Sequence, residues 1–244
     1  MRKVVLLIVE GISEEIALAM PLRRLFAIQP SGETIEFQVV SGDITTNKGT
    51  TVSNIKEQLN RIVKEFLGKN KFRAKDLLEI VLLADTDGAY ITDDAIKEDV
   101  TYLKPSYTDS CILCKDKAAI IERNQQKRRI LDLLIPLREL QGIPFSVYYF
   151  SCNLDSVLHN EANLEDRQKT KKAEKFEQEY GENPSGLLRF FSNSAAITGT
   201  TYEESWAYIK ERNHSLQQST NFHVFLSMQA KSFPRDFSQL LANE

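Results

Sequence analysis

Carboxylate side chains follow two apolar runs of this 244-residue chain, at the point where each run ends. This acidic set consists of Glu10, Glu14, Asp85 and Asp87. Two unit charges ~5 Å apart repel each other by roughly 3 kcal/mol at an effective dielectric constant near 20, so four together need a compensating charge. Carboxylate oxygens are the ligands that Mg²⁺ and Mn²⁺ prefer. The acidic set therefore predicts a Mg²⁺ or Mn²⁺ site.

Two buried strands are predicted to carry these acids to one edge of a sheet. Residues 3–9 (KVVLLIV) and 79–85 (EIVLLAD) are apolar almost throughout, which is typical of strands buried on both faces. A further strand at 34–42 lies between segments with helical spacing at 14–28 and 51–70. This alternation indicates right-handed crossovers and an α/β fold with a parallel sheet. Ligands of such sheets bind beyond the carboxyl ends of the strands, where the four acids would meet.

Each acidic stretch also has a structural explanation that involves no ligand. Ser13 is expected to cap the helix that follows Glu10, and Pro21 is expected to kink or interrupt that helix. Acidic side chains near the start of a helix are stabilised by the positive end of the helix dipole, so the acids of EGISEE could serve only to cap the helix. ADTDGA could be a turn, because Asp and Gly are turn residues. Both stretches end buried strands at the ligand-binding edge, and this favours the metal site.

The rest of the chain is predicted to complete the sheet and to extend it with helices. Residues 88–114 are expected to form a long, irregular loop on the side of the site. We expect a long helix at 116–142 and a fourth strand at 143–151. Three further helices are expected at 153–160, 164–180 and 201–212, and a late strand at 221–228. We therefore expect a core over 1–152 and a helical C-terminal extension over 153–244 that packs on it.

Four other polar residues could support the acidic set. These candidates are Asp43, Asp155, His159 and Lys115. Asp43 follows the second strand closely enough to lie nearby. Asp155 and His159 are four residues apart on an expected helix and therefore share a face. Lys115 or Arg123 could stabilise negative charge on a phosphate group.

Composition limits the partners and the location of the chain. The net charge of −3 gives no overall attraction to nucleic acid, so phosphate contacts need local basic clusters such as 123–129 and 167–175. The three cysteines offer no disulfide framework, and Cys111 and Cys114 lack the further ligands of a zinc site. The apolar N-terminal run is too short for a signal peptide or a membrane span. We expect a cytoplasmic protein with no membrane partner.

The two acidic motifs together resemble those of the Toprim domain, which topoisomerases, bacterial primases and several nucleases share. Its hallmarks are a strand ending in Glu-Gly, here IVEG at 8–11, and a later strand ending in Asp-x-Asp, here LADTDG at 83–88. The form EGISE at 10–14 is similar to that of the OLD-family nucleases. The chain length and FSCNLDSVLHN at 150–160 resemble the small RloB-like proteins of prokaryotic phage defence.

This resemblance implies a Toprim-like, Rossmann-like sheet and a metal-dependent nuclease for DNA or RNA, with an endonuclease favoured over an exonuclease. It implies catalytic roles for Glu10, Asp85 and Asp87, with Glu10 as a metal ligand or general acid/base. Glu14, Asp85 and Asp87 would be metal ligands. It also implies a phage-defence effector that acts with an ATPase partner protein, since this sequence has no GxxxxGK[ST] loop. Homo-oligomers fit the same resemblance.

Three other functions stay open. VLLADTDGAYI also resembles the nucleophile motif of haloacid-dehalogenase-type phosphatases, in which Asp85 would attack phosphate and Asp87 would be the acid/base. Ala89 stands where that family has Thr, and Glu10 and Glu14 would be left without a role. The Asp-x-Asp could instead be the metal motif of a nucleotide-sugar transferase. Alternatively, the chain could be a non-catalytic Toprim-fold subunit that acts through an ATPase partner.

Overall fold

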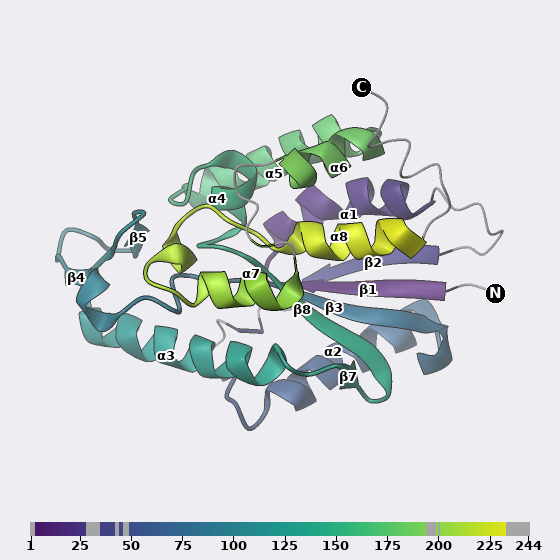
Figure 1. Ribbon diagram of the computed structural model, residues 1–244, viewed down its shortest axis with the longest axis horizontal. Helices are drawn as coiled ribbons and strands as arrows, with labels where there is room; N and C mark the ends of the chain where they lie inside the picture. Colours follow the sequence, from purple (N-terminus) through teal and green to yellow (C-terminus); the bar gives the residue numbers. More distant parts are fainter. Residues whose placement is uncertain are drawn as a thin grey trace.

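A five-stranded sheet with strand order β2-β1-β3-β8-β7 forms the centre of the molecule (Figure 1). Its strands are β1 Lys3–Val9, β2 Ile35–Ser41, β3 Leu77–Asp85, β7 Glu139–Leu140 and β8 Ile143–Phe150. All run parallel except the short edge strand β7, which is antiparallel to β8. This computed structural model describes residues 3–27, 35–41, 44–45, 49–193, 199 and 201–232. The predicted α/β class with a mostly parallel sheet is confirmed, and the arrangement is compatible with a Rossmann-like fold.

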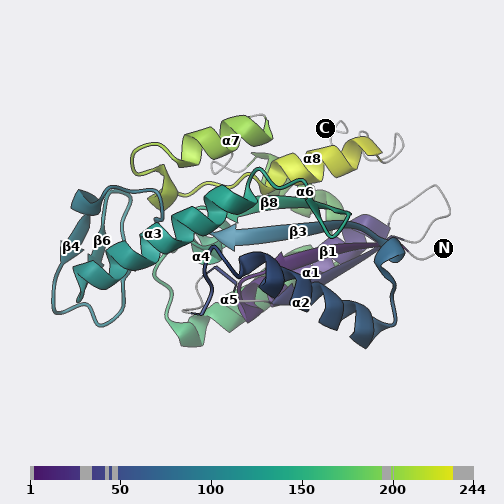
Figure 2. The same ribbon diagram turned by 90° about the horizontal axis from the view of Figure 1, so that it is seen from below.

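Helices cover both faces of the central sheet and give a three-layer molecule (Figures 1 and 2). One face packs against α1 Ile12–Ala27, α4 Leu154–His159, α5 Asp166–Tyr180, α6 Pro184–Asn193 and α8 Phe222–Ser232. The other face packs against α2 Ile55–Asn70, α3 Lys117–Leu134 and α7 Tyr202–Ile209. Successive side chains of a strand point to opposite faces, so Val5 and Leu7 join the first core while Leu6 and Ile8 join the second. No helix in the described part of the chain is long and apolar enough to span a membrane.

Helix α1 differs from the prediction at both of its marker residues. It begins at Ile12, so Ser13 lies in the first helical turn and not at the N-cap. It also continues through Pro21, which is buried inside it. Proline removes one backbone hydrogen bond from a helix interior. The apolar face of α1, with Leu18 and Leu22 fully buried against the sheet, offsets that loss.

Two predicted elements in the second half are also wrong. The helix predicted over 116–142 ends at Leu134, and the chain then makes the β7–β8 hairpin. The strand predicted over 221–228 is the first part of helix α8. Its aromatic and β-branched residues resemble the pattern of a strand. In the structure, Phe222 and Phe225 are fully buried in the core beside β8, and a helix buries them there as well as a strand would.

A small three-stranded sheet replaces the irregular loop that was predicted over 88–114. Its strands are β4 Ile96–Glu98, β5 Ser106–Tyr107 and β6 Ile112–Cys114, in the order β4-β6-β5, after the 3-10 helix η2 Asp93–Ala95. Ile96 and Ile112 are buried with Leu216 in a separate apolar cluster. The small sheet lies beyond the carboxyl ends of the central strands, next to the start of α3 (Figure 1).

The segment 214–221 returns to the end of β8 and backs this edge of the sheet. It begins with the 3-10 helix η3 His214–Leu216. The Ser151 N–H donates to the Ser219 carbonyl at 2.8 Å, and the Cys152 N–H donates to the Ser215 carbonyl at 3.1 Å. An antiparallel bridge joins Phe150 to Thr220. The C-terminal part of the chain thus supports the edge that carries the acids.

Candidate active site

The four predicted acids lie in one cluster at the carboxyl ends of β1 and β3. These two strands are parallel neighbours, and Glu10 and Asp85 stand at their ends. Burial raises the pKa of Asp85 well above its usual range, and the charges of Glu14 and Glu10 raise it further. Asp87 acts on the pKa of Asp85 in the same direction. Each of the other three acids is therefore close enough to Asp85 to repel its charge.

Glu14 reaches this cluster because residue 11 has no side chain. A Cβ atom on Gly11 would lie 2.6 Å from the Oε2 atom of Glu14. Glu14 is buried in the first turn of α1, and burial raises the pKa of its carboxyl group. Its own backbone N–H lowers that pKa, while the charges of Glu10 and Asp155 raise it. The Glu-Gly pair thus brings a second carboxylate back to the strand end.

The turn after β3 holds Asp87 in a left-handed backbone conformation. Asp87 has φ 49° and Gly88 has φ 69°, a region that Gly adopts freely and Asp tolerates. The Asp87 N–H donates to the Cys152 carbonyl at 2.7 Å, and the Asn124 side chain donates to the Gly88 carbonyl at 3.0 Å. A Cβ atom on Gly88 would lie 2.7 Å from a methyl group of Leu216. The turn is therefore fixed from three sides.

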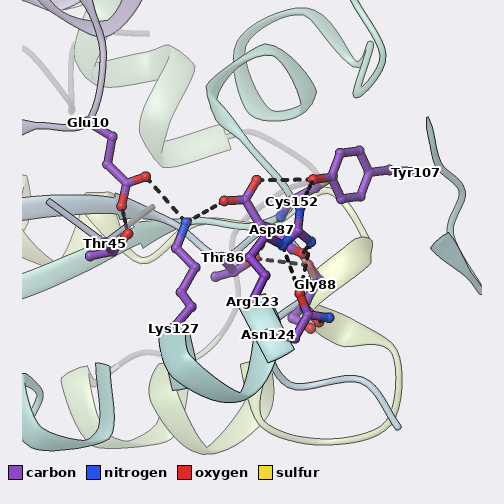
Figure 3. A network of polar contacts seen from close by, with 11 residues as sticks. Glu10, Thr45, Thr86, Asp87, Gly88, Tyr107, Arg123, Asn124, Lys127 and Cys152 are labelled. Carbon is purple, nitrogen blue, oxygen red and sulfur yellow. Dashed lines mark hydrogen bonds and ion pairs between the residues drawn. The ribbon is translucent and has the colours of Figure 1, made fainter. Parts of the chain in front are cut away.

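A buried lysine of α3 stands between two of the acids (Figure 3). The Nζ atom of Lys127 lies 3.3 Å from Oε2 of Glu10 and forms an ion pair with Asp87. The Lys127 side chain is 1% exposed. Burial lowers its pKa, but the charges of Asp87 and Glu10 outweigh burial and raise it above its usual value. The Thr45 hydroxyl donates to the other oxygen of Glu10. Lys127 is therefore a charged group that fixes the two carboxylates.

Arg123, one helical turn before Lys127, fixes the other side of Asp87 (Figure 3). Its guanidinium donates to the Asp87 carbonyl at 2.8 Å and to the Tyr107 hydroxyl at 2.9 Å. The Tyr107 hydroxyl in turn lies 3.3 Å from the Asp87 carboxylate. Burial raises the pKa of Asp87, but the charges of Lys127 and Arg123 outweigh it, and the net shift is downward. Asp87 is thus an ionised, fully paired carboxylate.

Asp155 lies beside the cluster, as the predicted supporting role requires. It is buried in α4 and raises the pKa of Glu14. Burial raises the pKa of Asp155 itself, and Lys169 of α5, 3.7 Å away, lowers it. Its Oδ1 atom is buried and has no hydrogen-bond partner within the described residues. Asp155 is therefore a further oxygen donor at the margin of the site.

The other supporting candidates are not brought to the cluster. His159 packs its ring against Phe176, 6.3 Å between ring centroids, in a cavity that Lys172 and Lys175 also line. Burial and the nearby Lys172 lower the pKa of His159. Lys115 is exposed two residues before α3 begins, and the first residue of α3, Lys117, already lies ~15 Å along the helix axis from Lys127. Asp43 lies outside the described residues.

Sequence reasoning missed Lys127, and Arg123 was only one of several candidates. Both belong to the basic cluster 123–129, in which four residues are positively charged. Their spacing of four residues places Arg123 and Lys127 on the same helix face. From the sequence, this spacing could have indicated a shared basic face on the helix. Only the packing of α3 on the sheet shows that this face points toward the acids.

The donor atoms of the cluster are carboxylate oxygens, which a hard divalent cation prefers, but the described side chains are not arranged around an ion. The Asp85 side chain forms no hydrogen bond with any residue that the structure describes, although the charge of Lys127 lowers its pKa. Burial is the largest cause of its raised pKa, and the neighbouring acids add to it; a Mg²⁺ or Mn²⁺ ion would offset this repulsion. Glu14 and Glu10 are the neighbouring oxygen donors, whereas Asp87 is paired with Lys127. Within the described residues, no three His, Cys, Asp or Glu side chains are drawn together as they would be around an ion.

Comparison of the chain with protein-family models, with curated proteins and with solved structures finds no match.

Proposed function

We propose that this chain is a Toprim-like nuclease that depends on Mg²⁺ or Mn²⁺. The observation that supports this best is the group of four carboxylates at the ends of β1 and β3, in which Asp85 is repelled by the other three. A phosphodiester carries negative charge, so a site made of acids can bind it only together with cations. Lys127 and Arg123 already offset the charges of Glu10 and Asp87, so the proposed metal ion would be the cation that binds the phosphate.

The residues of the site would have different roles in metal binding, positioning and proton transfer. Asp85, Glu14 and Glu10 would hold the metal ion, which when bound activates a water molecule and stabilises negative charge on the phosphate oxygens. Lys127 is a positioning residue, because it fixes the carboxylates of Glu10 and Asp87 without being accessible to solvent. Glu10, at the end of β1, would be either a metal ligand or the general acid/base.

The biological setting in this proposal rests on the resemblance to the OLD-family and RloB-like proteins. It comprises action on DNA or RNA, a role as a phage-defence effector, an ATPase partner and self-association. None of these is needed for the chemistry of the cluster, so each requires a test of its own.

A cleavage assay with an isosteric variant tests the proposal. Purified wild type and Asp85→Asn are incubated with supercoiled plasmid, single-stranded DNA and RNA in Mg²⁺, Mn²⁺ or EDTA. Asp85→Asn removes the charge that its neighbours repel, so the variant remains folded. We expect metal-dependent cleavage by the wild type and a rate at least about 100-fold lower for the variant. Asp94→Asn, at an exposed acid of η2, is the matched control and should cleave at the wild-type rate.

A phosphatase assay in the same series separates the alternatives. Hydrolysis of p-nitrophenyl phosphate that Asp85→Asn abolishes, without cleavage of any nucleic acid, would identify a phosphatase in place of the nuclease. Activity in neither assay would support the non-catalytic subunit and overturn the proposal for the isolated chain.

A further inference from the structure

A polar cavity of ≈ 380 Å³ opens beside the candidate site. Its walls come from the small sheet, from the link between α4 and α5, and from η3 with the residues that follow it. The polar residues that line it include Tyr107, Asp109, Ser156, Asn160, Glu161 and Gln218. A volume of this size lies within the range of about 300–1,000 Å³ that is usual for small-molecule sites.

The cavity is held in a fixed place relative to the acids. Tyr107 lines it, and the hydroxyl of the same residue lies 3.3 Å from the Asp87 carboxylate. Asn163, also in the wall, accepts a hydrogen bond from the Tyr107 N–H and donates one to the Tyr107 carbonyl, both at 2.7 Å. This pair of bonds joins the small sheet to the α4–α5 link. A ligand in the cavity would therefore lie one residue away from the proposed catalytic centre.

The lining is suited to a neutral group rich in donors and acceptors. Neither lysine nor arginine lines the cavity among the described residues, so a phosphate group has no cation to bind there. The side chains of Asp109 and Asn160 form no hydrogen bonds with any other residue that the structure describes. A carboxylate accepts from an exocyclic amine, and a carboxamide can pair with the donor and acceptor edge of a base. Glu161 is engaged by Lys172 in an ion pair, which leaves Asp109 as the free acid.

We propose that this cavity binds one unpaired nucleobase that carries an exocyclic amine, adjacent to the phosphodiester that the acids cleave. The inference rests on the proposed nuclease function and adds a preference to it. A base within a duplex cannot enter such a cavity, so the substrate is single-stranded or locally unpaired. Asp109 accepts a hydrogen bond from the amine of cytosine, adenine or guanine, which uracil and thymine lack.

Binding of two oligomers of the same sugar and size, one of cytosine with the amine and one of uracil with a carbonyl oxygen in its place, tests the inference. Fluorescein-labelled oligo(dC) and oligo(dU) of equal length are titrated with protein by fluorescence anisotropy, with Ca²⁺ in place of Mg²⁺. We expect the wild type to bind oligo(dC) about 3- to 10-fold more tightly, the effect of one hydrogen bond. Asp109→Ala should bind both oligomers equally. Asp94→Ala, which changes an exposed acid outside the cavity, should keep the preference.

A second variant guards against an indirect effect of the first. Asn160→Gly keeps the left-handed backbone of this position, φ 56°, and removes only the carboxamide. A carboxamide can flip to pair with either base, so this variant should weaken binding of both oligomers and keep the preference for oligo(dC). Equal binding of both oligomers by the wild type, or an unchanged preference in Asp109→Ala, would overturn the inference and leave the nuclease proposal intact. No binding of either oligomer would overturn the inference, and the cleavage assay decides separately on the nuclease.

Discussion

Gly11 shows how much of the site depends on one missing side chain. A Cβ atom here would collide with the end of a flexible glutamate and with no backbone atom, so the fold can adjust. Gly11→Ala should therefore fold normally and displace the Glu14 carboxylate from the cluster. We expect the affinity for Mn²⁺ to fall at least about 10-fold, as for the loss of a group that orients metal ligands, measured by isothermal titration calorimetry.

Gly68→Ala is the matched control for this prediction. Gly68 lies in α2, and nothing is within 4 Å of the Cβ atom that the substitution adds. It should leave Mn²⁺ affinity unchanged and raise helix stability slightly. If Gly11→Ala bound Mn²⁺ as tightly as the wild type, Glu14 would not be a ligand.

The acids of the site could be predicted from the sequence, but their counter-charge could not. Glu10, Asp85 and Asp87 follow continuous apolar runs, and the rule that ligands bind at the carboxyl ends of parallel strands places them together. Lys127 lies in a run of charged residues whose pattern is that of a solvated helix face. Its burial depends on the rotation of α3 against the sheet, which is set by contacts far away in the sequence.

At the scale of elements, β3 carries a second, half-buried acid at its other end, and this acid connects the sheet to α8. The carboxylate of Glu79 accepts hydrogen bonds from Ser146 of β8 at 2.8 Å and from Gln229 of α8 at 3.0 Å. Burial nevertheless raises its pKa, since these two bonds only partly offset the loss of hydration. The contact is therefore sensitive to pH.

This shift predicts how stability changes with pH. An acid whose pKa is higher in the folded than in the unfolded state binds its proton more tightly when folded. The wild type therefore loses stability as pH rises from the unfolded value near 4 through the raised folded value. Glu79→Gln cannot titrate, so its stability relative to the wild type should increase toward neutral pH, as measured by urea unfolding at a series of pH values. Glu174→Gln, at an exposed position, should show no such trend.

Most elements with a clear sequence pattern were predictable, including the buried strands, whereas the strands of the small sheet and helix α8 were not. The first three central strands and α2 agree with their sequence patterns to within a few residues. Strands of two or three residues, as in the small sheet, are too short to display a recognisable alternation of apolar and polar residues. Helix α8 is apolar on several sides because the core surrounds Phe222 and Phe225, and its sequence therefore resembled that of a buried strand.

At the scale of the whole molecule, Asn221 joins the C-terminal segment to the centre of the fold. It is fully buried, accepts from the Tyr149 N–H at 2.8 Å and donates to the Ser205 hydroxyl at 3.0 Å. Asn221→Ala removes both buried hydrogen bonds, the one from the Tyr149 N–H and the one to the Ser205 hydroxyl, at a cost of roughly 1–3 kcal/mol. We expect a lower free energy of unfolding by that amount in urea titrations.

A control substitution at a less buried asparagine tests whether the loss of stability is specific to Asn221. Asn213→Ala changes a half-buried residue just before η3 that caps nothing with its side chain, and it should alter stability by less than about 0.5 kcal/mol. An effect of Asn221→Ala as small as that of Asn213→Ala would show that the C-terminal segment is not coupled to the sheet.

The support that the segment 214–221 gives to the acidic turn has a consequence during protein synthesis. The Thr86 hydroxyl, next to both Asp85 and Asp87, donates to the carbonyl of Ser215, which lies 129 positions later. A ribosome must therefore translate the chain at least through Ser215 before all the groups that hold this turn are present. For the nuclease proposed above, a nascent chain without this support would pose little danger to the messenger RNA that encodes it.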